Sequence, residues 1–416
     1  IAEALTNIVF APLKEGLKSV SLSANWMWPC KNEGEDARLY KAVQAISEFA
    51  IDLGINVPTG KDSLSMKQRY KNEEVISPGT VIISAAANCT DITNVIEPVL
   101  QQNGGGIYYV NLSEDSYKLG GSSFAQVLNR IGSEAPSILN NESFKNTFNA
   151  IQELITTGKI LAGHDVASGG LITTLLELCF ADTNLGADYD LSSLNEVDSV
   201  KVLFAENSGI VFQAIDNSVE AILKDSNVVF HKIGSVNNSG NISIKNNTDE
   251  FSFSVSEMRN TWYKTSYLLD QKQTANGLAK ARIENFAKQP LQYTFPKHFT
   301  GKIPVIDASK PKPKAAILRE KGSNSEREMA NAMYLAGFDV KDVHMTDLIS
   351  GRETLEDIQF LGAVGGFSNS DVLGSAKGWA GAIKYNEKAN TVINNFFKRK
   401  DTLSVGICNG CQLFME

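Results

Sequence analysis

Residues 403–412 read LSVGICNGCQ, and this stretch decides how the end of the chain folds. An apolar strand end leads into a G-x-C-x-G sequence centred on Cys408, which has the spacing of a nucleophile elbow. In such a turn a strand bends sharply into a helix, and glycines flank the nucleophile because side chains would clash there. The pattern predicts an exposed thiol at the end of a strand, beside helix amides that could hold an oxyanion.

Cys411 follows Cys408 at C-x-x-C spacing, which leaves other interpretations open. The pair could be a redox motif on a strand-to-helix turn, half of a zinc site, or two structural cysteines. Zinc is disfavoured because no second Cys/His pair lies at ligand spacing. A thiol nucleophile also needs a base; His298 and His344 lie upstream, and no histidine follows Cys408.

The hundred residues before this turn repeat a strand-loop-helix pattern. We expect strands at 315–319, 339–343, 360–364 and 402–405, and helices at 325–336 and around 392–397. This alternation predicts a doubly wound parallel α/β domain over residues 314–416. About four strands is few for a parallel sheet, so we expect the domain to be incomplete at its end.

Residues 1–258 show a different, mixed pattern that predicts two α+β domains, at 1–97 and 98–258, the first incomplete at its start. A helix is expected at 34–53, with one apolar face and Gly54 as its C-terminal cap. That face is made of Tyr40, Val43, Ile46, Phe49, Ala50 and Leu53. Further strands are expected at 80–87, 107–112, 159–163, 202–204, 209–214 and 228–233, and helices at 122–131, 144–157 and 169–181. Residues 259–313 contain a polar helix and the run KPKPK, and are predicted to be a linker.

The composition excludes several classes of protein. With 39 basic and 47 acidic residues the net charge is −8, so no general affinity for nucleic acid or an anionic membrane is expected. The longest apolar run, around residues 81–87, is too short to span a bilayer. Five scattered cysteines indicate a reducing, cytoplasmic setting rather than a disulfide framework.

Gly365, Gly366 and Phe367 directly follow a predicted strand. Paired glycines at this point allow backbone N–H groups to face a ligand, here an oxyanion near Cys408. The alternative is an ordinary glycine-rich loop.

A second polar loop, residues 164–170 with the sequence HDVASGG, lies between a strand and a helix. Its backbone amides could bind phosphate, and Asp165 could bind Mg²⁺. In the simpler interpretation, Asp165 or Ser168 only caps the helix.

Two features nearer the start of the chain are weaker. Glu3 and Asn7 are spaced i, i+4 and offer oxygens that suit a hard cation, although such a pair is usually a solvated helix face. Lys61 lies in the stretch GKDSLSMK, which lacks the spacing of a P-loop and could be a surface turn.

Taken together, a series of stretches in one order resembles the large single-chain form of the phosphoribosylformylglycinamidine synthase family. They are LSANWM at 22–27, GEDA at 34–37, GKDSLSMK at 60–67, HDVASGGL at 164–171, AILRE at 316–320, AGFD at 336–339, VHM at 343–345, GGFS at 365–368, DVLG at 371–374, GWA at 378–380 and GICNGCQ at 406–412. The resemblance covers essentially the whole chain. It implies aminoimidazole-ribonucleotide-synthetase-like α+β domains, followed by the first part of a class I glutaminase domain.

The resemblance also implies a reaction. The family converts formylglycinamide ribonucleotide, ATP and glutamine to the formylglycinamidine, in de novo purine biosynthesis. A Cys-His-Glu triad hydrolyses glutamine, and the released ammonia attacks an intermediate that ATP has activated at the synthetase site. A thiolate suits glutamine hydrolysis because it attacks the amide and is then released from a thioester.

Carried over to this chain, the resemblance assigns roles to the residues introduced above. Cys408 is the nucleophile, and Gly365, Gly366, Phe367 and Asn409 form the oxyanion and glutamine-binding region. Glu3, Asn7 and Asp165 are Mg²⁺ ligands of a second nucleotide site that holds ADP in the family, and Ala167 and Lys61 are nucleotide-binding. Some relatives have a serine where Ala167 stands, so only a backbone contact is expected there.

The resemblance further implies that parts of the enzyme lie outside this chain. These are the first synthetase half with its ATP-binding loop, a fourth acidic Mg²⁺ ligand, and the His and Glu of the triad. We therefore expect the chain alone to be inactive in both half-reactions. Two alternatives remain open: a non-catalytic nucleotide-binding or interaction protein with this fold, and a stand-alone synthetase of the aminoimidazole ribonucleotide synthetase type.

Overall fold

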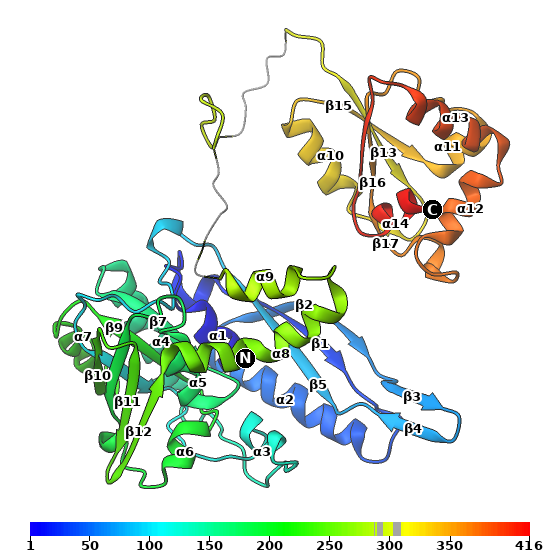
Figure 1. Cartoon of the computed structure of the whole chain (residues 1–416). Helices are drawn as coiled ribbons and strands as arrows, with labels where there is room; N and C mark the ends of the chain where they lie inside the picture. The colour runs from blue at the N-terminus through cyan, green and yellow to red at the C-terminus, as the bar shows by residue number, and fades with distance from the viewer. Residues whose placement is uncertain (287, 289–293, 303–308) are drawn as a thin grey trace. The chain divides into compact units, whose positions relative to one another are not determined.

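The computed structural model describes residues 1–286, 288, 294–302 and 309–416. The chain divides into two compact units, Ile1–Gln289 and Pro290–Glu416, which are described separately below (Figure 1).

The first unit is built on a mixed seven-stranded sheet with the order β12-β11-β8-β10-β6-β9-β7. Its strands are β6 (Ile107–Asn111), β7 (Ile160–Val166), β8 (Gly186–Asp190), β9 (Gly209–Ala214), β10 (His231–Asn237), β11 (Asn241–Asn246) and β12 (Asp249–Ser254). All neighbouring pairs are antiparallel except β11 and β8, which run parallel. The strand β7, which carries the predicted polar loop at its end, is an edge of this sheet.

Both faces of this sheet are covered by helices, and the alternation of side chains along β6 shows how. Tyr108 packs into one apolar cluster with helices α4 (Asn141–Thr156) and α7 (Val219–Asp225). Tyr109 points the other way, into a cluster with α5 (Gly170–Glu177), α6 (Ser199–Phe204) and the start of α8 (Val255–Gln273). Successive residues of a strand face opposite sides of a sheet, so β6 is buried on both.

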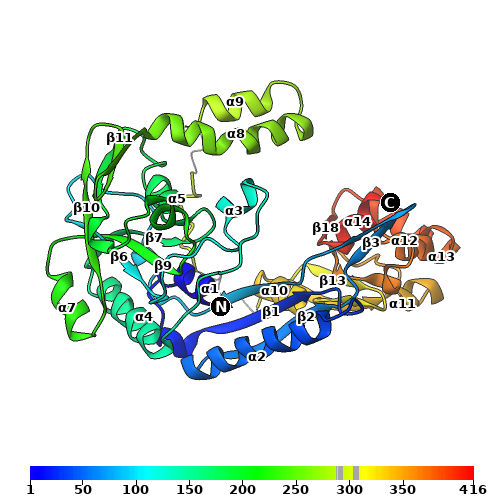
Figure 2. The same cartoon turned by 90° about the horizontal axis from the view of Figure 1, so that it is seen from below.

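The first 97 residues form a smaller layer that shares the first of these clusters. Strands β2 (Asn56–Ser63), β1 (Ser21–Met27) and β5 (Thr80–Ala86) form a sheet in that order, and helix α2 (Glu35–Leu53) runs along it (Figure 2). Leu22 and Leu53 belong to the same buried cluster as Phe144 of α4. Apolar packing is therefore continuous across residue 97, and the domain boundary predicted there stays a prediction.

Smaller elements complete the first unit. Helix α1 (Ala2–Ile8) packs between β5 and β7, and α3 (Ser123–Val127) is a single short helix. The strands β3 (Lys67–Tyr70) and β4 (Glu73–Ile76) form a separate antiparallel hairpin. Helices α8 and α9 (Leu278–Glu284) lie side by side (Figures 1 and 2).

The second unit is a four-stranded parallel sheet with the order β15-β13-β16-β18. Its elements are β13 (Lys314–Arg319), α10 (Glu326–Leu335), β15 (Asp339–His344), α11 (Met345–Ser350), β16 (Phe360–Ala363), α12 (Lys377–Lys384), α13 (Glu387–Lys398), β18 (Leu403–Gly406) and α14 (Asn409–Met415). A short pairing of β14 (Ser323–Asn324) with β17 (Gly365–Gly366) joins two loops at the carboxyl edge of the sheet.

The chain order of this sheet places helices on both faces. Right-handed crossovers put α10 on one face and α11, α12 and α13 on the other, because the chain reverses direction after β15. Consistent with this, α11, α12 and α13 contact one another, whereas α10 contacts β13 and β15. The predicted doubly wound parallel sheet with four strands is confirmed.

Two predictions about local structure are wrong. Residues 202–204, predicted as a strand, lie in helix α6, because the Asp198 side chain caps its first amides and the apolar residues then pack as a helix face. The apolar face of α2 is buried only toward its C-terminal end. Ala50 and Leu53 are buried, but Tyr40 is 70% exposed and Val43 is 45% exposed.

The predicted linker is ordered in its first part. Residues 259–284 belong largely to α8 and α9, while residues 287, 289–293 and 303–308 of the linker lie outside the described residues. Among the described helices, none has the length and apolar character needed to cross a membrane.

Candidate functional site

Cys408 occupies the turn between β18 and α14 with φ 54° and ψ −113°. This backbone conformation is rare and costly for a residue that has a Cβ, and it is typical of functional turns. The side chain is exposed at the carboxyl end of the parallel sheet, where loops converge. The predicted elbow is therefore present in the backbone geometry itself.

The two flanking glycines of the elbow are required by space. A Cβ on Gly406 would lie 2.5 Å from the carbonyl oxygen of Gly410, and a Cβ on Gly410 would lie 2.1 Å from that of Ala363. Both distances are far below van der Waals contact, and both neighbours are backbone atoms that cannot swing aside. The G-x-C-x-G spacing follows from the tight approach of β16, β18 and α14.

The loop at Gly365 lies directly against the nucleophile. A Cβ on Gly365 would lie 3.2 Å from the Cβ of Cys408, and Gly366 has φ +97°. The amide of Phe367 donates to the carbonyl oxygen of Gly322 at 3.0 Å, so that amide is already engaged. The predicted neighbours of Cys408 are thus brought together, and their oxyanion role stays a prediction.

A buried hydrogen bond joins this loop to the elbow. The hydroxyl of Ser368 donates to the Asn409 side-chain oxygen at 2.6 Å, and both residues are 2% exposed. The Asn409 amide nitrogen in turn donates to Gln412 at 3.1 Å. Ser368 was missed from the sequence because a serine in a polar glycine loop carries no distinguishing signal.

His344 is placed away from the thiol. It ends β15, at the opposite edge of the sheet from β18, and three strand spacings separate the two strands by about 14 Å. Its ring nitrogens lie 3.0 Å from the Thr346 hydroxyl and 3.9 Å from the Glu320 carboxylate. His344 therefore serves as the N-terminal cap of α11 and is not placed as a base for Cys408.

The five cysteines differ sharply in environment. All are free; Cys408, Cys411 and Cys89 are exposed, and Cys30 is partly buried. Cys179 is buried, and burial raises the pKa of its thiol to about 12. Only the elbow combines an exposed thiol with a strained backbone.

A second candidate site is a cavity of about 730 Å³ between α1, β5 and the C-terminal end of β7, which extends through His164 and Asp165 of the predicted loop. Glu3, Asn7, Asp165 and Ala167 all line it, although the first two are more than 150 residues from the others. Leu5 is buried on the side of α1 opposite Glu3 and Asn7, and both Glu3 and Asn7 line the cavity. Four of the five residues predicted for nucleotide and metal binding are thus brought together.

Lys61 is the exception. It lies on β2, and its ammonium group donates to the Ser63 hydroxyl at 2.7 Å. Since β1 separates β2 from β5, Lys61 is not among the residues that line the cavity. Its nucleotide-binding role stays a prediction.

A histidine beside Asp165 adds positive charge to the same cavity. His164 Nε2 lies 3.0 Å from Glu177 and Nδ1 lies 3.2 Å from Asp165. Burial disfavours the charged imidazole, but the hydrogen bonds to the two carboxylates outweigh it and raise the pKa of His164 to about 9. The ring is therefore cationic at neutral pH, which the sequence pattern did not indicate.

The backbone of the 164–170 loop is held by a distant carboxylate. Glu206 Oε1 accepts from the amide of Gly169 at 2.8 Å and from that of Ser123 at 2.8 Å. Gly169 and Gly170 both have positive φ, which shows why this turn carries two glycines. Glu206 follows α6, whose residues 202–204 were predicted as a strand. Nothing in the sequence around Glu206 indicated that it would bind these two amides.

The donors in the cavity have the chemistry of a Mg²⁺ site. Carboxylate and amide oxygens are the ligands this cation prefers. The Thr6 hydroxyl donates to the backbone carbonyl of Glu3 and not to its carboxylate. Nevertheless, within the described ranges no three His, Cys, Asp or Glu side chains converge in a metal-binding group. The donor atoms are therefore of the type that binds Mg²⁺, but among the described residues they do not form a complete set of ligands.

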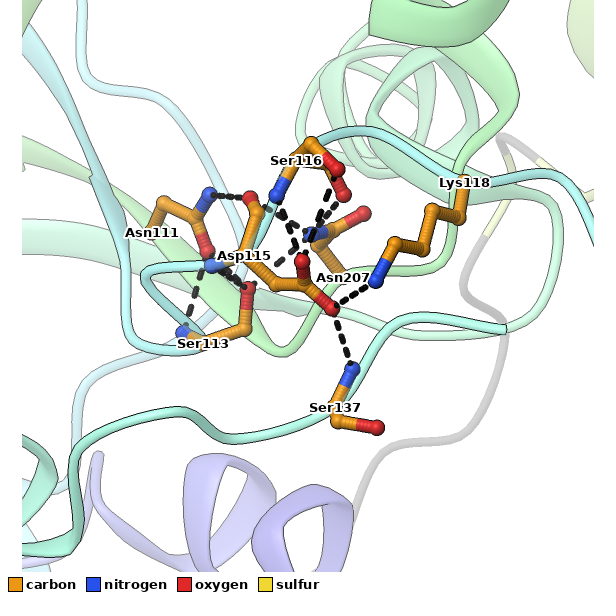
Figure 3. Close-up of polar contacts among 7 residues, drawn as sticks. All are labelled: Asn111, Ser113, Asp115, Ser116, Lys118, Ser137 and Asn207. Carbon is orange, nitrogen blue, oxygen red and sulfur yellow. Dashed lines mark hydrogen bonds and ion pairs between the residues drawn. The ribbon is translucent and has the colours of Figure 1, made fainter. Parts of the chain in front are cut away.

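A separate polar network supports the loop after β6 (Figure 3). The Asn207 amide donates to the Ser113 hydroxyl and to the carbonyls of Asp115 and Ser116, at 2.9 to 3.2 Å. Asp115 accepts from Lys118 at 2.7 Å and from the amide of Ser137 at 3.0 Å. These bonds lie within one compact loop cluster, so the network is structural.

Family models match three parts of the chain, in the expected order. Residues 1–88 match an FGAR-AT PurM_N-like domain, residues 102–246 match the C-terminal domain of AIR synthase related proteins, and residues 312–416 match a CobB/CobQ-like glutamine amidotransferase domain. The predicted fold class is confirmed by these matches.

Curated relatives match nearly the whole chain. The probable chloroplastic/mitochondrial phosphoribosylformylglycinamidine synthase of Arabidopsis thaliana is 39% identical, over 99% of this chain and 30% of the relative. The human phosphoribosylformylglycinamidine synthase is 40% identical, over 99% and 31% respectively. By sequence, the chain is similar over nearly its whole length to one part of these phosphoribosylformylglycinamidine synthases.

A probable phosphoribosylformylglycinamidine synthase of Caenorhabditis elegans is 37% identical, over all of this chain and 33% of the relative. The chain thus spans about a third of the length of these synthases. Since the Arabidopsis synthase is named chloroplastic/mitochondrial, the cytoplasmic location predicted for this chain stays a prediction.

Solved structures resemble the chain more distantly. Thermotoga maritima PurL complexed with ATP is 13% identical with a TM-score of 0.42, over 62% of this chain and 39% of that chain. The hydrogenase maturation protein HypE in complex with ATP is 14% identical with a TM-score of 0.45, over 61% and 77%.

Proposed function

We propose that the chain is part of an ATP-dependent amidotransferase, a carbon-nitrogen ligase that uses glutamine to convert formylglycinamide ribonucleotide to formylglycinamidine ribonucleotide. One observation carries this proposal: Cys408 is held in a strained elbow at the carboxyl end of a parallel sheet, in a chain that is similar to one part of these synthases. The same elbow counts against a stand-alone synthetase, for which a glutaminase nucleophile would serve no purpose.

The role of the elbow is glutamine hydrolysis. The Cys408 sulfur, as thiolate, attacks the side-chain amide carbon of glutamine and forms a tetrahedral oxyanion. Gly365 packs against Cys408, and the backbone amides of Gly365, Gly366 and Asn409 would stabilise that oxygen. The carbon–nitrogen bond then breaks, the nitrogen leaves as ammonia after gaining a proton, and water hydrolyses the thioester to glutamate.

The role of the second cavity is nucleotide binding. We place ADP or ATP in the cavity of about 730 Å³, with Glu3, Asn7 and Asp165 as the side chains that would hold Mg²⁺. Bound Mg²⁺ would neutralise phosphate charge. The backbone at Ala167 would add contacts to the phosphate groups, whereas both ring nitrogens of His164 lie against Glu177 and Asp165, so that ring would contribute only its charge.

A glutamine-derived diazoketone, which alkylates a thiol only when bound as glutamine, tests the first role. We expect mass spectrometry to find the label on Cys408, and excess L-glutamine to prevent it. Exposed Cys411 and Cys89 serve as internal controls. Equal labelling of all three, or no protection by glutamine, would contradict a glutamine site. Glutamine turnover by the same chain tests the prediction that it is inactive alone.

Calorimetry with ADP and Mg²⁺ tests the second role. We expect Asp165→Asn and Glu3→Gln to weaken binding by roughly tenfold each, because each removes a charged metal ligand. Glu48→Gln, a change at an exposed acidic residue of α2 that does not line the cavity, is the control and should leave the affinity unchanged. An unaltered affinity in both variants would place the nucleotide elsewhere.

A further inference from the structure

The hairpin of α8 and α9 lines another cavity, of about 290 Å³, that lies outside both candidate sites. One face of α8 lines it with Arg259, Tyr263, Ser266, Tyr267 and Asp270, at the spacing i, i+4, i+7, i+8 and i+11. A helix face that packs on a neighbouring helix is usually apolar, yet this one carries charged and hydroxyl groups. The composition of the face therefore needs an explanation beyond packing.

Arg259 is the unusual member of this set. It is only 5% exposed, and its Nη1 is screened from solvent without a hydrogen-bond partner anywhere in the described part of the chain. Aromatic rings cover the faces of its guanidinium group, with Tyr263 at 4.5 Å and Phe286 at 3.0 Å from ring centre to Cζ. An aromatic ring attracts a guanidinium cation that lies over its face. It does not accept hydrogen bonds from the N–H groups that point outward in the plane of the guanidinium.

The charges around the cavity do not balance. Asp270 is the one carboxylate that lines it, and it pairs with Arg282 at 3.1 Å. Arg259 is thus left as an excess positive charge among the described lining residues, and burial lowers its pKa. A buried cation without a counter-ion is costly, and an anion in the cavity would remove that cost.

From this geometry we propose that the α8–α9 cavity binds a small oxyanion, a carboxylate or phosphate group on a planar body, through the in-plane N–H groups of Arg259. Arginine presents these donors as a fork that matches the two oxygens of such a group. Tyr263 and Tyr267 supply ring surface for the planar body. Phe286 lines the same cavity from the end of the hairpin.

The cavity volume limits the size of the ligand. A space of about 290 Å³ lies at the lower end of known ligand sites, so a single-ring molecule fits and a dinucleotide does not. This proposal is independent of the glutaminase and nucleotide roles, since none of its residues lines either of those sites.

Binding of three one-ring probes to the full chain tests the proposal. Benzoate carries a carboxylate, phenyl phosphate carries a phosphate, and benzamide has a similar shape without charge. We expect at least one anion to saturate the chain, by calorimetry or by the change in tyrosine fluorescence, and benzamide not to bind. The preferred anion identifies the oxyanion class. Equal binding of benzamide, or no saturation by either anion, would overturn the proposal.

Variants of the chain separate this site from a merely structural arginine. Arg259→Met should weaken anion binding by roughly tenfold or more, since a charge-assisted hydrogen bond is lost. The same variant should raise the melting temperature of the ligand-free chain, because an unpaired buried charge is removed. A structural arginine would lower it instead.

Two further variants are controls. Lys280→Gln removes a cation from an exposed position of α9 outside the cavity and should leave binding within about twofold of the unaltered chain. Arg259→Lys keeps the charge without the fork and should bind with intermediate affinity. If the Arg259→Met variant binds the anion as tightly as the unaltered chain, Arg259 is not the anion-binding residue, whatever the stability of the variant.

Discussion

The Ser368 hydroxyl donates a buried hydrogen bond of 2.6 Å to the side chain of Asn409, the residue directly after the nucleophile. This bond connects two turns that are 41 residues apart in the chain and that meet at the carboxyl edge of the second unit's sheet. Because the Gly365 loop and the elbow both shape the space around the Cys408 sulfur, the bond fixes one turn relative to the other. Ser368 is therefore a positioning residue for the thiol.

Removing this hydroxyl should affect both stability and thiol reactivity. Ser368→Ala leaves the Asn409 oxygen buried without a donor, which costs about 1–3 kcal/mol of unfolding free energy. We expect the rate at which the glutamine-derived diazoketone labels Cys408 to fall, while labelling of Cys411 is unchanged.

Ser404→Ala is the matched control for this variant. Ser404 lies on β18, four residues before Cys408, and is exposed, so neither stability nor labelling should change. If Ser368→Ala loses stability but labels at the original rate, the bond supports the fold and does not position the thiol.

The glycines of the elbow allow a prediction with an internal comparison. Gly410→Ala places a Cβ 2.1 Å from the carbonyl oxygen of Ala363, so the strand and helix must separate. We expect a loss of about 3 kcal/mol or more in unfolding free energy, since overpacking against backbone cannot relax through a rotamer. Chemical denaturation of the full chain measures this loss.

Gly381→Ala provides the comparison. Gly381 lies within α12, and its nearest atom to a new Cβ is a Tyr385 ring carbon at 3.9 Å. Alanine is the better helix former, so the variant should gain up to about 1 kcal/mol. Equal losses at the two positions would show that the close approach at Gly410 is not what requires glycine.

Sequence reasoning predicted the second unit well because its signals are local. Each strand of a parallel sheet is a short apolar run, and each run is followed by a loop and an amphipathic helix, as at 315–336. The elbow adds a backbone constraint that only glycine meets, which makes Cys408 identifiable from spacing.

Prediction was weaker where packing between distant segments decides the outcome. Residues 202–204 have the composition of a strand, and only the Asp198 cap makes them a helix. Glu177 and Glu206 carry no local signal, because their partners His164, Gly169 and Ser123 come from other segments. Resemblance alone indicated that Glu3 and Asn7 belong with Asp165, since an i, i+4 pair does not show what it faces.

Glu206 should be important for both turns that it joins. Glu206→Ala removes two hydrogen bonds to a charged acceptor, and we expect a loss of about 2–4 kcal/mol in unfolding free energy. Hydrogen exchange should accelerate at the amides of Gly169 and Ser123 together. ADP affinity should fall as well, because the turn at Ala167 borders the proposed nucleotide cavity.

Glu206→Gln keeps an oxygen acceptor and should recover most of this stability. Acceleration at only one of the two amides in Glu206→Ala would show that the carboxylate does not hold both turns at once.

Asp115 gives a prediction that depends on pH (Figure 3). Burial acts to raise the pKa of this carboxyl, but the ion pair with Lys118 and the amides of Ser137 and Ser116 outweigh it, so its pKa lies below the ordinary value. A pKa that folding lowers stabilises the fold at every pH above the unfolded-state value of about 3.9. That contribution is lost as the pH falls through the lower folded-state value.

Asp115→Asn should therefore cost about 1–2 kcal/mol of unfolding free energy at pH 7, where the charge-assisted bonds are lost. The difference from the unaltered chain should shrink below about pH 4, because protonation then neutralises Asp115 in both states. Denaturation at a series of pH values measures this trend. Glu153→Gln changes an exposed residue of α4 and is the control; its unfolding free energy should equal that of the unaltered chain at every pH. If Asp115→Asn loses the same unfolding free energy at every pH, the loss comes from altered packing and not from the charge of Asp115.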